Sequence, residues 1–443
     1  MEASNATPHG PLGIEDLRQR LAKDPRDMRA RFALAGQLMD AGHPQEAIQH
    51  FEILLKQDPR QHLARYFLAA CYAETGQLEQ AQSHLRRVIK ARPDYAPAHH
   101  LMGKSLMIQG RLDEAVEEFR RAIAHEEGTR DPVSHVYLGE ALIAQGKLAE
   151  AREAWQQAVE IAPGDASLQA NLGALLLDLG DYENSIAHSR QALAIDPGRA
   201  DALYNIGMAY IRQARPRDAV APLEEAARLR PDDVDTHNTL GSCYATLGDI
   251  TKAEAEWRQV LEISPHDPVA LFNLGLERAR AHDFAGAAEL WAEVVRHHPT
   301  HLQAVYNLGV AYLELGRPQD ALPHWESLSK LDVRNPNVFL YQGETLALLK
   351  RPGEAEKAIR RAMEINPRDT RALFDLGALS ALRDRAGDAV RLWHEALAQD
   401  PELRPARVSA LLPLLDGPFW DRLDKALTGQ GAELARTVRR LLG

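Results

Sequence analysis

The sequence of 443 residues predicts an all-α protein, an α-solenoid of about eleven helix–turn–helix units with helical caps at its two ends. A 34-residue spacing of prolines is the first observation behind this prediction, and a recurring pattern of small and bulky residues within each period is the second. A fixed period of this length is typical of a stacked array, in which each unit packs against its neighbours and no central core forms. The prolines on this spacing are Pro25, Pro59, Pro93, Pro163, Pro197, Pro231, Pro265, Pro299, Pro367 and Pro401.

Each unit is numbered here from the third residue after its preceding proline position, so that eleven units cover residues 28–403. Positions 8 and 20 hold only small residues, which let two antiparallel helices approach closely where they cross. Position 8 is Ala35, Ala69, Gly103, Gly139, Gly173, Gly207, Gly241, Gly275, Gly309, Gly343 and Gly377. Position 20 is Ala47, Ala81, Ala115, Ala151, Ser185, Ala219, Ala253, Ala287, Ala321, Ala355 and Ala389.

Position 24 is bulky in nearly every unit, and we expect its side chains to fill the space that the small residues leave. These residues are Phe51, Leu85, Phe119, Trp155, Leu223, Trp257, Trp291, Trp325, Ile359 and Trp393. Unit five carries Ser185 and Ser189 at positions 20 and 24, which predicts a looser helix pair there. Glycine at position 15 is expected to end the first helix at a positive φ, and proline at position 32 to stop the second helix. These glycines are Gly42, Gly76, Gly110, Gly146, Gly180, Gly248 and Gly316.

The ends of the chain and one internal segment depart from the repeat. Residues 1–12 are expected to be a disordered N-terminus, residues 13–27 an N-terminal capping helix, and residues 404–443 a C-terminal helical cap that docks on the last unit. The interval from Pro93 to Pro163 is 70 residues, two more than two periods. The extra residues fall in the segment HEEGTRDP around Glu127, where insertions into repeats usually form loops. We therefore expect a loop there, and a slight change in the course of the array.

Composition excludes several classes of function. A net charge of −11 without a basic stripe argues against nucleic acid as a partner. The absence of any run of 18 apolar residues predicts no transmembrane segment, and the N-terminus lacks the apolar core of a signal peptide. The two cysteines, Cys71 and Cys243, are five units apart, so we expect reduced thiols and a cytoplasmic location. The chain could also be a fragment of a larger protein.

The small–small–bulky–proline pattern resembles the tetratricopeptide repeat (TPR) family over residues 28–403. This resemblance implies a right-handed superhelix whose concave groove is lined by the first helices, at positions 2, 5, 6, 9, 12 and 13. Some members of the family grip a C-terminal carboxylate with Lys and Arg at positions 2, 5 and 6. Here positions 5 and 6 hold neither residue, so binding of that type is not expected.

Position 6 carries the candidate binding residues, because it forms a polar row centred on units five to nine. The polar row resembles the asparagine ladder in the TPR superhelix of O-linked N-acetylglucosamine transferases, which holds an extended peptide by its backbone. An Asn amide offers both a donor and an acceptor, which match the C=O and N–H of a peptide. Aromatic residues at position 5 would add rigid contact area. The predicted peptide- or partner-binding residues are Asn171, Asn205, Asn273, Asn307, Asp375, Tyr204, Phe272, Tyr306 and Phe374.

The same pattern has a structural interpretation. An aromatic residue followed by Asn is common at these positions in TPR proteins generally, and serves helix packing or solubility. The choice between peptide capture and packing stays open on the sequence alone.

Nothing in the sequence indicates catalysis. It contains no GxSxG, no phosphate-binding loop, no HExxH and no CxxC, so we expect no enzyme activity and no cofactor. Histidines gather at His297, His298 and His301, but no carboxylate or cysteine completes a tetrahedral set beside them in the sequence. No metal site is therefore predicted.

The sequence thus predicts a non-catalytic interaction scaffold or adaptor that binds an extended peptide or partner protein in the concave groove. One alternative is the substrate-recognition arm of a glycosyltransferase-type enzyme, truncated or acting in trans, although residues 404–443 are too few for a nucleotide-sugar domain. Another is an assembly factor for an envelope, secretion or polysaccharide-export complex. Homo-oligomerisation is compatible with each of these functions.

Overall fold

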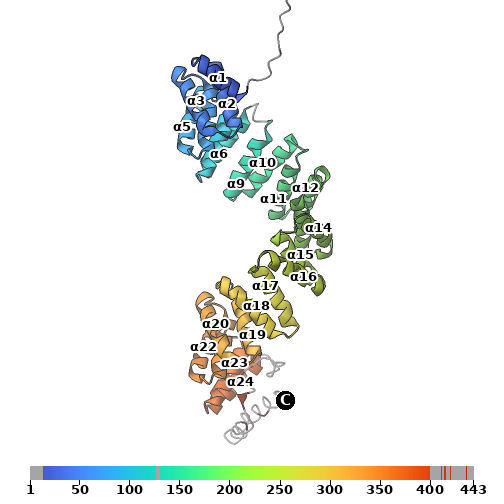
Figure 1. Ribbon diagram of the computed structural model, residues 1–443. Coiled ribbons are helices and arrows are strands. Elements are labelled where there is room, and N and C mark those ends of the chain that lie inside the picture. The colour runs from blue at the N-terminus through green and yellow to red at the C-terminus, as the bar shows by residue number, and fades with distance from the viewer. Residues whose placement is uncertain are drawn as a thin grey trace, which may run out of the picture. The chain divides into compact units, whose positions relative to one another are not determined.

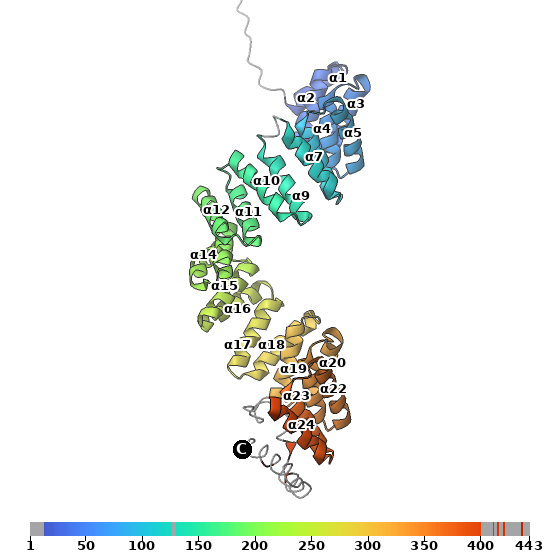
Figure 2. The ribbon, with the colours of Figure 1, turned by 180° about the vertical axis from the view of Figure 1, so that it is seen from behind.

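The computed structural model describes residues 13–125 and 130–399, together with Leu411, Leu414, Leu415, Trp420 and Arg436. These residues form 23 α-helices and no β-strand, which confirms the predicted fold class (Figure 1). The chain divides into two compact units, Met1–Leu229 and Arg230–Gly443, and the boundary lies inside the repeat array. Figure 2 shows the same helices from behind, with the members of each helix pair side by side. None of the described helices is long and apolar enough to cross a membrane.

The first compact unit holds thirteen described helices. They are α1 (Ile14–Lys23), α2 (Met28–Asp40), α3 (Pro44–Gln57), α4 (His62–Glu74), α5 (Leu78–Ala91), α6 (Ala96–Ile108), α7 (Leu112–Ala124), α9 (Pro132–Ala144), α10 (Leu148–Ile161), α11 (Ala166–Asp178), α12 (Tyr182–Ile195), α13 (Ala200–Arg212) and α14 (Pro216–Leu229). The buried Leu17 and Leu21 of α1 join the apolar cluster of α2 and α3, so α1 covers the end of the first repeat. The insertion around Glu127 and residues 1–12 lie outside the described residues.

The second compact unit holds ten described helices. They are α15 (Val234–Leu247), α16 (Ile250–Ile263), α17 (Pro268–Arg280), α18 (Phe284–His297), α19 (Leu302–Glu314), α20 (Pro318–Leu331), α21 (Pro336–Leu348), α22 (Pro352–Ile365), α23 (Thr370–Leu382) and α24 (Ala386–Gln399). In both compact units, the first helix of every repeat begins at position 1 of the sequence numbering. Most of the predicted cap at 404–443 lies outside the described residues, but Leu411, Leu415 and Trp420 are buried in one cluster with α23 and α24.

Close contact between position 8 and position 24 explains the small residues of the repeat. A Cβ added to Gly275 would lie 2.4 Å from Nε1 of Trp291, and one added to Gly309 would lie 2.6 Å from the ring of Trp325. Both distances are well inside van der Waals contact, so the backbone of the first helix rests directly on the aromatic ring. Trp291 also donates its Nε1–H to the carbonyl of Phe272 at 3.1 Å, which ties position 24 to position 5 of the same repeat.

The expectation of a looser helix pair in unit five is wrong. Ser185 and Ser189 are fully buried, and the hydroxyl of Ser185 donates to the carbonyl of Gly173 at 2.7 Å. A Cβ on Gly173 would lie only 2.5 Å from Oγ of Ser189. Small residues on both helices let α11 and α12 approach each other closely, and the hydrogen bond of Ser185 joins the two helices.

Position 15 adopts the left-handed conformation whether or not it is glycine. The seven glycines there have φ between 67° and 84°. In four other repeats the position is a residue with a side chain and φ of 57–60°: Ala214, His282, Lys350 and Asp384. The turn geometry is therefore imposed by the helix pair and not by the residue type, at a steric cost in these four repeats.

A buried polar contact, which the sequence did not suggest, recurs between position 4 and the preceding proline. His237 places Nε2 3.2 Å from the carbonyl of Pro231 and Nδ1 2.6 Å from Glu256, and His99 makes the same pair of contacts with Pro93 and Glu118. The bond to Glu256 raises the pKa of His237. In six other histidines burial lowers the pKa: His50, His84, His100, His135, His188 and His324.

Candidate peptide-binding surface

The nine predicted binding residues all lie on first helices. Three of them, on α11 and α13, belong to the first compact unit, and the other six, on α17, α19 and α23, belong to the second. The structure gives these residues three different environments, which their shared repeat positions do not distinguish.

In the first compact unit, Asn171 and Asn205 differ in what their amides contact. Asn171 is exposed on α11, and its side-chain amide makes no hydrogen bond to another described residue. Asn205 is only 8% exposed, and its Nδ2 donates to the carbonyl of Ala170 at 3.2 Å. The amide of Asn205 therefore ties α13 to α11, whereas the amide of Asn171 faces solvent. Tyr204, beside Asn205, is half-buried.

In the second compact unit, Asn273 and Asn307 are half-buried, and their side-chain amides make no hydrogen bond to another residue that the structure describes. Their aromatic neighbours belong partly to the core. The ring centroid of Phe272 lies 6.3 Å from that of Trp291, and the ring centroid of Tyr306 lies 5.4 Å from that of Trp325. Burial also raises the pKa of the Tyr306 hydroxyl. Position 5 thus builds the floor of this surface, and position 6 supplies its polar groups.

A hollow of about 430 Å³ lies beside Asn307, between α19, the end of α20 and the start of α21. Its lining combines amides with an aromatic ring and aliphatic side chains: Leu302, Gln303, Tyr306, Asn307, Leu328, Asp332, Asn335, Asn337 and Val338. Binding pockets are typically mostly apolar with a few placed polar groups, and their volumes start near about 300 Å³. This hollow has the size for one or two side chains of a peptide that crosses the surface.

At the last repeat, the corresponding residues are covered by the chain itself. Phe374 and Asp375 are fully buried, so they are not exposed to a partner in this structure. The backbone N–H of Leu411 donates to Oδ1 of Asp375 at 3.3 Å. Trp420 stacks on Trp393 with ring centroids 5.8 Å apart. A position-6 side chain here accepts a hydrogen bond from a backbone N–H that is distant in the sequence.

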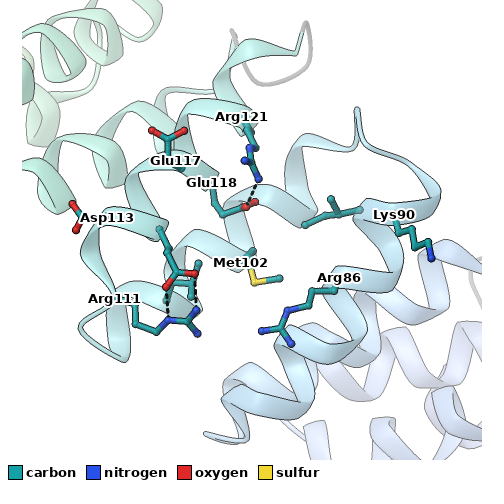
Figure 3. Close-up of a pocket in the computed structure, with 11 residues that line it drawn as sticks. Arg86, Lys90, Met102, Arg111, Asp113, Glu117, Glu118 and Arg121 are labelled. Atoms are coloured by element: carbon teal, nitrogen blue, oxygen red, sulfur yellow. Dashed lines mark hydrogen bonds and ion pairs between the residues drawn. The ribbon is translucent and has the colours of Figure 1, made fainter.

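A second type of hollow lies on the second helices. This hollow, of about 540 Å³, lies between α5 and α7 and has Met102 of α6 at its base (Figure 3). On the α7 wall, Arg121 donates to Glu118 at 2.7 Å. On the α5 wall, Arg86 and Lys90 form no ion pair with any residue in the described parts of the chain. This charged hollow was not predicted, since its walls come from two repeats.

The two cysteines are buried, and neither forms a disulfide with another described residue. Burial raises the pKa of the Cys71 thiol to about 11 and raises that of Cys243 as well. A thiol with a raised pKa is a poor nucleophile, so neither cysteine has the properties of a reactive residue.

Sequence profiles described as tetratricopeptide repeat match most of the chain. The matched ranges are 11–58, 38–104, 96–124, 130–197, 164–232, 204–268, 272–329 and 311–370. The chain belongs to the tetratricopeptide repeat family. Arrays of TPR units generally act as protein-interaction scaffolds, because stacked repeats present an extended surface to other chains.

Several solved structures are similar to parts of this chain. YrrB, described as a TPR protein with an unusual peptide-binding site, is 21% identical with a TM-score of 0.38, and the match covers 42% of this chain and 95% of that one. The C-terminal part of a TPR protein from Cytophaga hutchinsonii is 14% identical with a TM-score of 0.47, over 55% of this chain and 99% of that one. The APC/C Cut9–Hcn1 hetero-tetramer gives 14% identity and a TM-score of 0.38, over 94% and 92%. No curated protein sequence matches this TPR chain.

Proposed function

We propose that this TPR protein is a non-catalytic scaffold that holds an extended polypeptide segment by its main chain, through the amides of Asn273 and Asn307 in the second compact unit, and that Asn171 can do the same within the first. The hollow beside Asn307 would receive side chains of the same segment. Asn205 stabilises the array instead, because its amide is bonded to Ala170.

The contact between Asp375 and the N–H of Leu411 carries this proposal. It is an instance, within this chain, of a position-6 side chain that bonds a backbone N–H from outside the repeats. Asn171, Asn273 and Asn307 occupy the same repeat position, and their side-chain amides have no hydrogen-bond partner among the described residues. Since an Asn amide offers both a donor and an acceptor, each of the three could bond both groups of a peptide unit.

Selection of peptides from a random, unstructured library on the wild-type protein supplies ligands for a test. The variant Asn171→Ala/Asn273→Ala/Asn307→Ala should bind the selected peptides more weakly while keeping its helical circular dichroism spectrum. Asn184→Ala is the matched control, because the Asn184 amide bonds only the adjacent Asp181 on a second helix. Equal affinity of the triple variant and the wild type for every selected peptide would contradict the proposal.

A further inference from the structure

Two histidines and a glutamate come together beside the helix pair of unit eight. His266 lies in the turn between α16 and α17, and Glu293 and His297 lie one turn apart at the end of α18. His266 is 27 residues from Glu293 in the sequence, and the proline stop of α16 and the chain reversal of the repeat bring it there. All three residues belong to the second compact unit.

One carboxylate oxygen lies between the two imidazoles. Oε1 of Glu293 is 3.1 Å from Nδ1 of His266 and 3.0 Å from Nε2 of His297. The two rings are stacked, with centroids 4.0 Å apart, and the three atoms lie within 4.8 Å of one another. Two nitrogens and one oxygen therefore face one small region of space.

A neighbouring arginine orients the carboxylate. Arg296 donates to Oε2 of Glu293, the oxygen that does not face the histidines. Oε1 is thereby left as the single oxygen directed at the two rings. Partners of this kind, which fix a ligand without touching the metal, are typical of metal sites.

We propose that His266, Glu293 and His297 form a binding site for a divalent transition metal, with Zn²⁺ as the ion that fits best. In the tautomer that places a lone pair on the facing nitrogen, both imidazoles and Oε1 become donors to one ion, with no net change of proton number. Imidazole and carboxylate ligands suit Zn²⁺, whereas Mg²⁺ and Ca²⁺ prefer all-oxygen sets.

The ligand atoms are already close together, but the two stacked imidazoles must turn so that their in-plane lone pairs converge on one ion. Zinc bonds of about 2.0–2.2 Å at tetrahedral angles place ligand atoms roughly 3.4 Å apart, a few tenths of an ångström more than the present N–O distances. His266 is 56% exposed, His297 38% and Glu293 23%, so these side chains can move and an ion can reach them from solvent. Three protein ligands leave one position for water.

The histidines that are adjacent in sequence to His297 do not join this site. Nδ1 of His301 accepts the N–H of Ala304 at 3.1 Å, as the cap of α19. His298 is exposed and is not part of the group of converging ligand atoms. His298→Ala is therefore a matched control, since it removes an equally accessible imidazole one residue away.

The full-length protein, stripped of metal with a chelator and free of any affinity tag, should be titrated with ZnCl₂ by calorimetry. We expect one zinc site per chain. Its affinity should fall at least about ten-fold in His266→Ala and in His297→Ala, because even the loss of a residue that only supports a metal ligand lowers metal affinity by that factor. His298→Ala should bind as the wild type does. Zinc should also raise the unfolding temperature of the wild type and of His298→Ala, but not of the double variant His266→Ala/His297→Ala.

Three outcomes would overturn the proposal. Identical isotherms for the wild type and the double variant would assign the binding to other histidines. Displacement of zinc by equimolar Mg²⁺ would exclude an imidazole site. A stoichiometry of one zinc per two chains, with a doubled mass in solution, would show that the three residues of one chain do not suffice.

Discussion

Replacing Gly275 with alanine tests how the repeat is held together. A Cβ at this position would lie 2.4 Å from Nε1 and 2.8 Å from Cδ1 of Trp291, a ring that is only 3% exposed and cannot rotate away. Overpacking of this kind typically costs about 1–3 kcal/mol. Displacement of the ring would also break its hydrogen bond to the carbonyl of Phe272, which adds about 1 kcal/mol.

The gain in helix propensity from glycine to alanine, about 1 kcal/mol, offsets part of this cost. We therefore expect Gly275→Ala to lower the free energy of unfolding by about 1–3 kcal/mol. Gly36 offers a matched control inside α2, because an added Cβ there would meet nothing within 4 Å. Gly36→Ala should stabilise the protein by up to about 1 kcal/mol.

Urea unfolding followed by circular dichroism gives the overall change, and hydrogen exchange measured over α17 and α18 locates it. The second measurement matters because repeat arrays unfold in parts, so one transition can average over several repeats. If Gly275→Ala stabilises the protein as much as Gly36→Ala does, close contact between positions 8 and 24 is not what selects the small residues.

Three further predictions concern other parts of the array. Lys350 has φ of 59°, so Lys350→Gly should relieve the strain of the left-handed conformation and raise the free energy of unfolding by roughly 1 kcal/mol. An unchanged urea midpoint would show that this strain is absent. Burial lowers the pKa of His84, so its contribution to stability is present above about pH 6.5 and is lost as the pH falls through the folded-state pKa. The pKa of His237 is raised, so its contribution is present at low pH and is lost as the pH rises through the folded-state pKa. His84→Gln should therefore reduce the fall in the free energy of unfolding that occurs when the pH is lowered from 7.5 to 5.5. An unchanged fall in this variant would contradict the role assigned to His84. Asn205→Ala should lower the free energy of unfolding by about 1 kcal/mol, because the hydrogen bond to Ala170 is lost, and should leave peptide binding unchanged. Weaker peptide binding with unchanged stability would show that Asn205 is a binding residue.

The repeat itself could be predicted from the sequence because its causes are local and periodic. The close contact of Gly275 with Trp291 follows from a fixed offset of sixteen residues, and the starts of the first helices follow from the proline positions. The expectation for Ser185 failed for a physical reason. The small Ser189 at position 24 lets the two helices approach closely, and the hydroxyl of Ser185 at position 20 bonds a carbonyl of the facing helix. The pattern of residue sizes does not show that bond.

The candidate binding surface was predicted only in outline. Asn205 and Asn307 share repeat position 6, but the repeat before Asn205 carries the small Ala170 at position 5, whose carbonyl accepts the amide. The repeat before Asn307 carries Phe272 in that place, and Asn307 makes no such bond to a described residue. Asp375 is buried, and its carboxylate accepts a hydrogen bond from the N–H of Leu411, 36 residues away. Such differences depend on neighbours that repeat position alone does not specify.

The central claim is that position-6 amides hold the main chain of a bound segment. The most direct measurement compares a library-selected peptide with its backbone N-methylated counterpart, on the wild type and on Asn171→Ala/Asn273→Ala/Asn307→Ala. At about 1 kcal/mol for each hydrogen bond, loss of Asn273 and Asn307, which belong to one compact unit, should weaken binding of the unmodified peptide there by roughly 30-fold. Methylation of the contacted amides should weaken binding to the wild type and have little further effect on the triple variant. Equal losses from methylation in both proteins would show that these asparagines do not hold the peptide backbone.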